Sequence, residues 1–299
     1  ASPSTLFSVA GKNVLVTGGS RGIGLMIAKA FADHGANVIL TSRDEKACED
    51  AAASINSSAA SSPNTVRYVA SNVSTRSGCK ELAKHVREEF DGKLDVLVNN
   101  AGTAWGEDPY SERESGRMNW GWDKVLDLNV KGMFYLSREC LPMLERQPSL
   151  SSSSAPSKNA EDAEDVEERA VEDPGRIINI GSIAGILSQE APTHAYDVSK
   201  AAVHHLTKKM SADLARKGVT VNCVAPGFVP SRMTAGLSLH GPDTKTMVDA
   251  VPLGRMGNAD DMGGACIYLA SRAGSWCTGV ILNVDGGAVG TAQIPLSSL

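Results

Sequence analysis

The sequence has 299 residues, of which 42% are hydrophobic and 21% charged, as is typical of a globular protein. Its net charge of −5 gives no general attraction for nucleic acid or anionic membrane, and no apolar run approaches the roughly 18 residues of a membrane span. No signal- or transit-peptide pattern is visible, and the six cysteines show no Cys-x-x-Cys or metal-type spacing. We therefore expect free thiols, no metal, no nucleic-acid or membrane partner, and a cytoplasmic location.

Short apolar segments alternate with amphipathic ones along the chain. Strands are predicted at residues 12–17, 36–41, 66–70, 94–99, 176–180, 219–224 and 280–284. Helices are predicted at residues 25–34, 45–56, 81–90, 123–144, 196–216 and 260–269. Strands that are apolar almost throughout indicate a parallel sheet covered on both faces. The pattern predicts a Rossmann-type, doubly wound α/β/α sandwich formed by one domain over residues 1–299.

Three segments depart from this alternation. Residues 147–173 are rich in serine and then in acidic residues, which predicts a mobile surface insertion with one frayed acidic helix. Residues 105–122 look like a loop, but their tryptophans should pack near a pocket, where Trp105 and Ile186 could line the substrate space. Residues 228–252 are expected to form a substrate lid with apolar contacts from Phe228, Met233, Leu237 and Leu239.

A glycine-rich turn joins the first predicted strand to the first helix. Glycines let the backbone approach a pyrophosphate, and the helix N-terminus offers free N–H groups. The spacing is Gly-x-x-x-Gly-x-Gly, and a tight strand–helix turn with no ligand would look similar. Its place after the first strand favours nucleotide binding. The predicted contacts in the turn are Gly18, Ser20, Arg21, Gly22, Ile23 and Gly24.

The end of the second strand distinguishes between the two nicotinamide nucleotides. An NAD site usually has an acidic residue there to bind the ribose hydroxyls. Here Thr41 and Ser42 are followed by Arg43, which can pair with a 2′-phosphate, and Arg21 can reach the same region. Either arginine alone could be a solvated surface charge, but the two together predict NADP(H) as the cofactor.

Tyr196 and Lys200 form the most informative pair in the chain. They lie four residues apart on a predicted helix and so share a face. A lysine ammonium stabilises a nearby phenolate and should lower the tyrosine pKa from about 10. Such a tyrosine can protonate a carbonyl oxygen, which a hydroxyl such as Ser182 could hold. The spacing also arises by chance on amphipathic helices, so the pair needs the other motifs for support.

Together these motifs resemble the short-chain dehydrogenase/reductase family over about residues 6–287, with the acidic insertion as the main departure. Further matching motifs are Asn99-Asn100-Ala101-Gly102, Asn129 in Leu128-Asn129-Val130-Lys131-Gly132, Pro226-Gly227 and Asp285-Gly286-Gly287. Residues 100–106 and 230–234 are similar to 3-oxoacyl-[acyl-carrier-protein] reductases of the rhamnolipid-pathway type.

The resemblance implies a role for each matching residue. Tyr196 would be the general acid, and Lys200 would lower its pKa and hold the nicotinamide ribose. Ser182 would orient the substrate carbonyl, and Asn129 would hold a water that connects Lys200 to solvent. Asn72, where the family commonly has Asp, would lie with Val73 against adenine. The adenosine side would be lined by Asn99, Ala101 and Gly102, and the carboxamide would be held by Pro226, Gly227, Val229 and Ser231, with Ser231 where the family commonly has Thr.

The function implied is NADPH-dependent reduction of a ketone, either a 3-oxoacyl group carried as a thioester or another hydrophobic carbonyl compound. Two alternatives stay open: an NADP-dependent dehydrogenase of a polyol or secondary-metabolite alcohol, and a non-catalytic NADP-sensing protein. The second is disfavoured because Ser182, Tyr196 and Lys200 are all present. The resemblance also implies a homotetramer or homodimer built on the helices predicted at 123–144 and 196–216.

Overall fold

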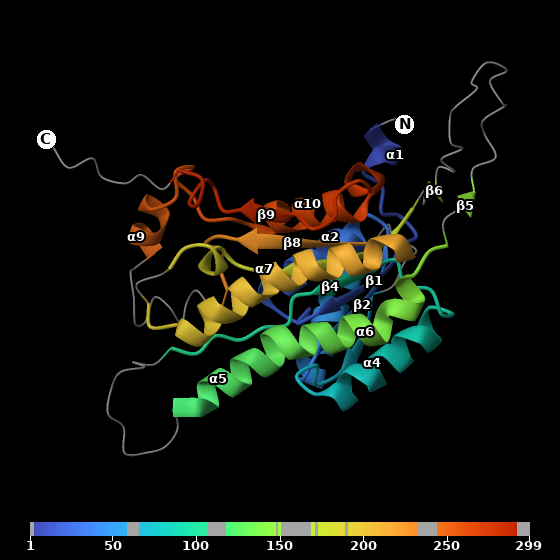
Figure 1. Cartoon of the computed structure of the whole chain (residues 1–299), viewed down its shortest axis with the longest axis horizontal. Helices are drawn as coiled ribbons and strands as arrows, with labels where there is room; N and C mark the ends of the chain where they lie inside the picture. Colours follow the sequence, from blue (N-terminus) through green and yellow to red (C-terminus); the bar gives the residue numbers. More distant parts are fainter. Residues whose placement is uncertain are drawn as a thin grey trace, which may run out of the picture.

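The computed structural model describes residues 3–58, 66–106, 118–147, 149–150, 169–170, 173–188, 191–231 and 244–291. Within these ranges a 7-stranded sheet has the order β3-β2-β1-β4-β7-β8-β9, and all its neighbouring strands are parallel (Figure 1). Its strands are β1 (Asn13–Thr17), β2 (Asn37–Ser42), β3 (Arg67–Ala70), β4 (Val96–Asn99), β7 (Gly175–Ile180), β8 (Val219–Pro226) and β9 (Ile281–Val284).

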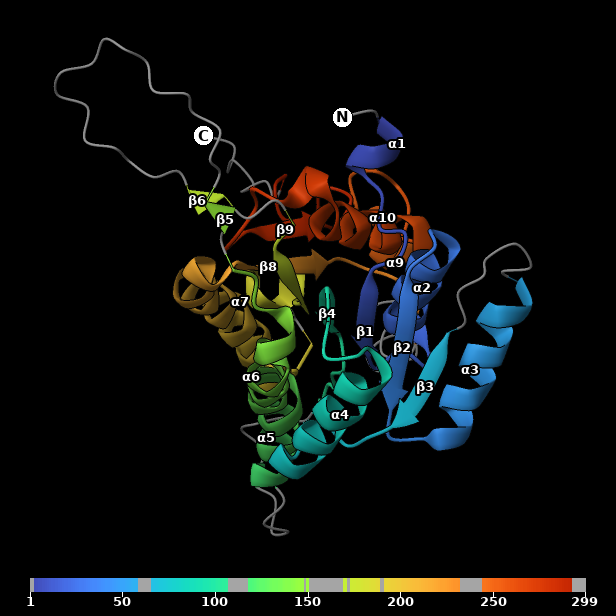
Figure 2. The ribbon, with the colours of Figure 1, turned by 90° about the vertical axis from the view of Figure 1, so that its right-hand side faces the viewer.

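Helices cover both faces of this sheet (Figure 2). One face carries α2 (Gly22–Asp33), α3 (Glu45–Ser58) and α10 (Ala259–Ala270). The other carries α4 (Arg76–Glu89), α6 (Met133–Leu144) and α7 (His194–Leu214). The predicted three-layer Rossmann-type fold is therefore confirmed. The remaining short helices are α1 (Pro3–Leu6), η2 (Ile183–Gly185), η3 (Ala215–Lys217), α9 (Thr244–Asp249) and η4 (Arg272–Gly274).

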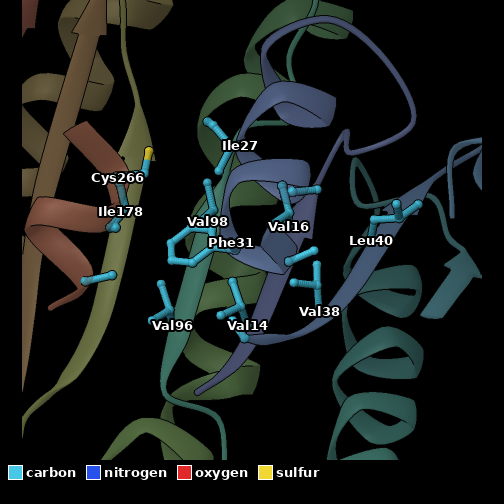
Figure 3. Packing of buried hydrophobic residues seen from close by; sticks show 14 of the residues in the cluster. Val14, Val16, Ile27, Phe31, Val38, Leu40, Val96, Val98, Ile178 and Cys266 are labelled. Carbon is cyan, nitrogen blue, oxygen red and sulfur yellow. The ribbon is translucent and has the colours of Figure 1, made fainter. Parts of the chain in front are cut away.

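The core divides into two layers because successive strand residues point to opposite faces. Val14 and Val16 of β1 pack in one cluster with Ile27 and Phe31 of α2 (Figure 3). Leu15, which lies between the two valines, belongs to the second cluster under α4, α6 and α7. Apolar residues at three successive positions of β1, Val14 to Val16, rather than at alternate ones, are what a sheet buried on both faces requires.

The long helical stretch predicted at 123–144 is helical throughout, but it is not a uniform α-helix. The chain instead forms α5 (Met118–Leu126), a π-helix η1 (Asp127–Gly132) and then α6. Helical structure therefore starts at Met118, inside the segment predicted as a loop up to Trp122. Of the predicted lid, residues 232–243 lie outside the described residues, and these include Met233, Leu237 and Leu239.

The predicted insertion begins and ends on a short β-ribbon, in which β5 (Ser149–Leu150) pairs antiparallel with β6 (Arg169–Ala170). Residues 151–168, which hold the predicted acidic helix, lie outside the described residues. Before the ribbon, Arg146 binds the Asp95 carboxylate at 2.9 Å. After it, Asp173 pairs with Lys12 and with the buried Arg176, each at 2.7 Å. Figure 1 shows the ribbon at the opposite end of the sheet from α9.

Two further observations concern the expectations from composition. Across the described ranges, no helix has both the length and the apolar character needed to cross a bilayer. The six cysteines are free thiols, and the described residues contain no group of three or more His, Cys, Asp or Glu side chains placed to hold a metal.

Candidate active site

The glycine turn between β1 and α2 has the geometry of a phosphate-binding turn. Gly18 and Gly22 have φ angles of +64° and +56°, which side chains other than glycine rarely adopt. A Cβ on Gly24 would lie 2.2 Å from the Gly18 carbonyl oxygen, so only glycine allows this close approach. Arg21 is the N-cap of α2, and its side chain makes no capping hydrogen bond to the first N–H groups of the helix. These N–H groups can therefore bind an anion.

Asn100 fixes this turn to the end of β4. Its Nδ2 donates to the carbonyl oxygens of Thr17 at 2.8 Å and Gly18 at 3.2 Å. In return, the Thr17 hydroxyl accepts hydrogen bonds from the backbone N–H groups of Asn100 and Ala101, both at 2.9 Å. Asn100 was recognised in the sequence only as part of a motif. The structure shows that it holds the predicted contacts Gly18, Ala101 and Gly102 in one rigid unit.

The end of β2 lies against the same turn and leaves cationic groups exposed. Ser20 donates from its hydroxyl to the Ser42 hydroxyl at 3.0 Å. Asp44 is the nearest carboxylate after β2 in sequence, but it accepts a hydrogen bond from the Ala47 N–H at 3.1 Å and so caps α3. Arg21 and Arg43 are both exposed here. This arrangement fits a 2′-phosphate better than a ribose hydroxyl, which needs a free carboxylate.

Asn72 and Val73 lie between β3 and α4. The Asn72 side-chain oxygen already accepts hydrogen bonds from the Ser74 hydroxyl at 2.7 Å and the Ser74 N–H at 3.2 Å. If Asn72 is to accept a hydrogen bond from the adenine amino group through this oxygen, Ser74 would have to move. Asn99 also acts inside the protein, because its buried Nδ2 donates to Ser137 and to Asn179 on β7, both at 2.9 Å.

Ser182, Tyr196 and Lys200 come together beyond the C-terminal end of β7. Ser182 precedes η2, and its hydroxyl lies near enough to the Tyr196 phenol to favour the phenolate by hydrogen bonding. Lys200 lies one turn after Tyr196 on α7, with its Nζ 5.5 Å from the centroid of the tyrosine ring. The same Nζ donates to the Ile180 carbonyl oxygen at 2.8 Å. The predicted grouping of hydroxyl, phenol and ammonium is therefore present.

The protonation properties of this group differ from the sequence-based expectation. Burial raises the pKa of Tyr196, the hydrogen bond with Ser182 lowers it, and the Asp197 carboxylate raises it. Burial also lowers the pKa of Lys200 from 10.5 to about 8. The expected lowering of the Tyr196 pKa by Lys200 is thus wrong, because removal from water disfavours the charged form of both groups. Ser182 is the group that favours the phenolate.

Asn129 lies in the π-helix η1 and is 1% exposed. Its Nδ2 donates to the Thr103 carbonyl and to the Ser199 hydroxyl, and its Oδ1 accepts from the Thr103 N–H, all at 2.9 Å. The side chain is therefore fully engaged in joining the loop after β4 to α7. A water bound at this position would have to use a backbone carbonyl, and a π-helix changes the pairing of such carbonyls.

The segment after β8 faces the glycine turn. The Gly227 N–H donates to the Val284 carbonyl at 3.1 Å, and Val229 is buried. A Cβ on Gly22 would lie 3.6 Å from the Ser231 Cβ, so residues 227–231 lie beside the start of α2. The predicted carboxamide contacts Pro226, Gly227, Val229 and Ser231 thus border the same space as the predicted pyrophosphate contacts.

Trp105, on the loop after β4, packs against α5. Its ring lies against Gly121 of α5, where a Cβ would be 2.3 Å from the Trp105 Cδ1 atom, and Lys124 Nζ is 5.5 Å from the ring centroid. A Cβ on the adjacent Gly106 would lie 3.8 Å from the Pro192 carbonyl, just before α7. Ile186, which follows η2 on the segment that carries Ser182, is exposed.

Comparisons with known proteins agree with this geometry. Residues 12–151 match the short chain dehydrogenase family, and residues 159–289 match the family described as Enoyl-(Acyl carrier protein) reductase. The rhamnolipids biosynthesis 3-oxoacyl-[acyl-carrier-protein] reductase of Pseudomonas aeruginosa is 37% identical over 94% of this chain and 97% of its own. A galactitol 2-dehydrogenase (L-tagatose-forming) of Cereibacter sphaeroides is 33% identical over 95% of this chain and 97% of its own.

Solved structures show the same relationship. The Pseudomonas aeruginosa RhlG/NADP active-site complex superposes with a TM-score of 0.77 at 36% identity, covering 95% of this chain and 99% of the other. A Burkholderia cenocepacia gluconate 5-dehydrogenase in complex with NADP and tartrate has a TM-score of 0.77 at 25% identity, with 97% and 99% covered. Fold, motifs and relatives agree: the chain is an oxidoreductase of the short-chain dehydrogenase/reductase family.

Proposed function

We propose that the protein reduces a ketone with NADPH and that Tyr196 protonates the ketone oxygen. The proximity of the Ser182 hydroxyl to the Tyr196 phenol, with Lys200 one turn further along α7, is the observation that carries this proposal. It places two hydroxyl groups where one carbonyl oxygen can accept from both of them. Lys200 supports the reaction by placing a cation behind the phenol, 5.5 Å from the ring centroid.

The residues of the glycine turn fit NADP(H). Gly18, Gly22 and Gly24 form a cradle that a Cβ would fill, and the α2 N-terminus supplies free N–H groups. Arg21 and Arg43 are the cationic groups for a 2′-phosphate. NADPH supplies a hydride when bound. Two related structures, of RhlG and of the gluconate 5-dehydrogenase, are described as NADP complexes, which supports the same choice.

The chain's own residues then handle the proton and the position of the substrate. Ser182 orients the carbonyl oxygen, and Tyr196 donates its phenolic proton to that oxygen as negative charge develops there. The resulting phenolate is stabilised by the Ser182 hydroxyl. Asn129 keeps the loop after β4 fixed to α7 through Thr103 and Ser199, which holds the wall next to the substrate in place.

For the substrate we propose a 3-oxoacyl thioester or another hydrophobic ketone. In this proposal Trp105 and Ile186 give the space beside Tyr196 an apolar border, and the Pseudomonas aeruginosa relative is named as a 3-oxoacyl-[acyl-carrier-protein] reductase. The galactitol 2-dehydrogenase relative favours a second candidate, NADP-dependent oxidation of a polyol. An exposed apolar border offers a polyol few hydrogen-bond partners, so the hydrophobic ketone is preferred.

We further propose a cytoplasmic homotetramer or homodimer formed by one domain. The outer faces of α6 and α7 expose Phe134 and Val198, with 41% and 49% of each residue accessible. Apolar side chains on two adjacent helices suit an interface between copies of the chain. Sedimentation equilibrium of the whole protein, compared with a Phe134→Glu and Val198→Glu double variant, tests the assembly. A wild-type monomer at micromolar concentration would exclude it.

Tyr196→Phe tests the reaction itself. NADPH binding, followed by titration calorimetry, should be unchanged, while turnover of a 3-oxoacyl thioester should fall by about 10²–10⁴-fold, because a general acid is lost. A panel containing the thioester, a bulky hydrophobic ketone and galactitol distinguishes the two candidate substrate classes. Near-normal turnover by Tyr196→Phe would falsify the assignment of the proton donor.

A further inference from the structure

His204 is a buried titratable residue that the proposed mechanism does not use. It lies one turn after Lys200 on α7, so Tyr196, Lys200 and His204 follow one another along the same face of the helix. Only 8% of His204 is exposed, and it is far too buried to be a solvated surface histidine. Its place in this row raises the question of what the imidazole ring contacts.

The ring lies between two glycines of the segment that carries Ser182. The imidazole lies against Gly185, where a Cβ would be 2.8 Å from its Cε1 atom, and the Gly185 backbone is close enough to raise the pKa of the ring by hydrogen bonding. Its Nε2 is buried and has no hydrogen-bond partner in the part of the chain that the structure describes, which leaves Nδ1 as the ring nitrogen for the Gly185 backbone. On the other side, a Cβ on Gly181 would lie 2.4 Å from Nε2 and 2.7 Å from the Cys223 Sγ. The ring thus fills the space that these two glycines leave.

The same segment is pressed against the backbone of α7. A Cβ on Gly185 would lie 2.6 Å from the Lys200 carbonyl carbon and 2.8 Å from the Ala201 nitrogen. Between the glycines, the Ser182 hydroxyl accepts a hydrogen bond from the Ala184 N–H at 3.1 Å. The backbone carbonyl of Ser182 accepts one from the Gly185 N–H at 3.0 Å. A shift of Gly185 is therefore transmitted directly to the Ser182 backbone and hydroxyl.

We propose that His204 is a positioning residue for Ser182. Its ring acts as a spacer between Gly181 and Gly185, and its Nδ1 hydrogen bond fixes the distance of the turn from α7. The imidazole itself touches neither substrate nor cofactor and acts only by keeping the Ser182 hydroxyl on the Tyr196 phenol. This inference rests on the proposed ketone reduction, in which that hydroxyl orients the carbonyl and favours the phenolate.

The surroundings keep His204 neutral in the range where the enzyme would be assayed. Burial lowers its pKa to about 4, and the ammonium groups of Lys200 and Lys208 on the same helix act in the same direction. Cys223, which faces it from β8, has a pKa raised to about 12 by burial. Neither group titrates between about pH 5 and 11, so a shift of a rate profile within that range comes from other groups, the Tyr196–Lys200 pair among them.

Two substitutions separate positioning from simple packing. His204→Phe keeps a ring of similar size but loses the hydrogen bond to Gly185. His204→Asn is smaller, but its amide nitrogen can occupy the place of Nδ1. We expect His204→Phe to lower kcat about tenfold while leaving the NADPH dissociation constant unchanged, and His204→Asn to recover most of the loss, as expected for one displaced hydrogen bond in the site.

The pH profile of alcohol oxidation gives a readout that packing alone would not move. The rate rises with pH as the phenolate forms, and loss of the Ser182 hydrogen bond should shift this rise to higher pH in His204→Phe and not in His204→Asn. His34→Phe is the matched control, because His34 makes a similar bond from Nδ1 to the Ala30 carbonyl at 2.8 Å on the surface. It should leave kcat and the profile unchanged.

Several results would overturn the inference. These are a wild-type kcat and profile in His204→Phe, an equal loss in His34→Phe, or an equal loss in His204→Phe and His204→Asn. If His204→Phe does not fold, His204→Gln is the substitute. Its amide lies near the position of Nε2 rather than that of Nδ1, so it should show the same loss of kcat. A wild-type protein that reduces no ketone contradicts the proposed function and this inference with it, whereas active wild type with unaffected variants contradicts the inference alone.

Discussion

Asn129 donates a hydrogen bond of 2.9 Å to the hydroxyl of Ser199, the residue directly before Lys200. The Ser199 hydroxyl in turn donates to the Tyr196 carbonyl at 2.7 Å. Asn129 also holds Thr103 on the loop after β4 by two bonds. One buried amide thus connects the helix that carries the proposed acid and lysine to the loop that leads to Trp105.

The first prediction concerns this connection. Ser199→Ala removes the acceptor for Asn129 Nδ2 and leaves a buried amide hydrogen unpaired, which should lower the free energy of unfolding by about 1–3 kcal/mol. We also expect kcat to fall several-fold because α7 loses its fixed distance from the loop. Urea denaturation and steady-state rates measure the two effects. Ser199→Thr, which keeps the hydroxyl, is the control and should recover kcat if the hydrogen bond is responsible.

The second prediction concerns nucleotide choice. Arg43→Asp replaces a proposed phosphate partner by a carboxylate able to bind ribose hydroxyls, so NADPH affinity should fall by about 10–100-fold and NADH should bind better than before. Titration calorimetry with both nucleotides measures the change. Arg272→Asp makes the same charge change on η4, outside the turn, and should leave the preference intact. An unchanged NADPH/NADH ratio in Arg43→Asp would show that Arg43 does not select the cofactor.

The third prediction follows from the buried lysine. The pKa of Lys200 is lowered from 10.5 to about 8, so the folded protein binds fewer protons here than the unfolded chain between these values. The penalty is complete below pH 8, diminishes as pH rises, and is absent above 10.5. Lys200→Met should therefore be more stable than wild type at pH 7 by about 2–3 kcal/mol, less the lost hydrogen bond to Ile180.

Thermal or urea unfolding of both proteins from pH 7 to 10 measures this difference. The advantage of Lys200→Met should shrink steadily above pH 8, while its turnover is lost at every pH. Lys208→Met, at an exposed position on the same helix, serves as the control and should show no pH-dependent difference. A Lys200→Met variant that is less stable than wild type at pH 7 and gains stability relative to it at pH 10 would contradict the lowered pKa.

The fourth prediction links the adenine side to the π-helix. A Cβ on Gly132 would lie 2.1 Å from the Val73 carbonyl oxygen, so Gly132→Ala must move either η1 or the segment proposed to contact adenine. We expect a loss of about 1–3 kcal/mol in stability and weaker NADPH binding. Gly264→Ala is the control, since a Cβ there meets nothing within 4 Å. Unimpaired NADPH binding by a folded Gly132→Ala protein would show that the packing of η1 on Val73 does not influence the segment proposed to contact adenine.

The fifth prediction concerns the wall formed by Trp105. Gly121→Ala places a methyl group 2.3 Å from the Trp105 Cδ1 atom and so must displace the ring. If Trp105 borders the acyl chain, KM for a long-chain 3-oxoacyl substrate should change several-fold, while KM for a short ketone and the NADPH dissociation constant stay the same. Equal changes for short and long substrates would place Trp105 outside the substrate space.

Much of the site could be predicted because its residues follow strand ends. Thr17, Asn99 and Pro226 end buried parallel strands, and Ser182 lies two residues beyond one, so they share one edge of the sheet whatever the details of the helices. The π-helix could not be predicted in this way, since residues 123–144 have an ordinary amphipathic pattern. Its close packing against Val73 and its hydrogen bonds to Thr103 come from residues distant in sequence.

Other features depended on contacts that a sequence pattern does not contain. The role inferred for His204 depends on Gly181 and Gly185, which no local spacing relates to it; the only signal was its position four residues after Lys200. The hydrogen bonds between Asn72 and Ser74 could have been predicted more easily, because Asn followed by Ser two residues later is typical of a local side-chain turn. The direction of the Tyr196 pKa depended on burial, which the helical spacing of Tyr196 and Lys200 does not reveal.

The ion pairs beside the β5–β6 ribbon have a practical consequence. Arg146 and Asp173 fix the two ends of the added segment to Asp95, Lys12 and Arg176. These lie at the N-terminal ends of β1, β4 and β7, whereas Ser182 follows the C-terminal end of β7. Lengthening the chain between these two anchors should therefore leave the positions of Ser182, Tyr196 and Lys200 unchanged. A longer loop costs little additional free energy of folding once its ends are held. This makes residues 151–168 a suitable place for a fluorescent label, an affinity tag or a whole inserted domain in an active enzyme.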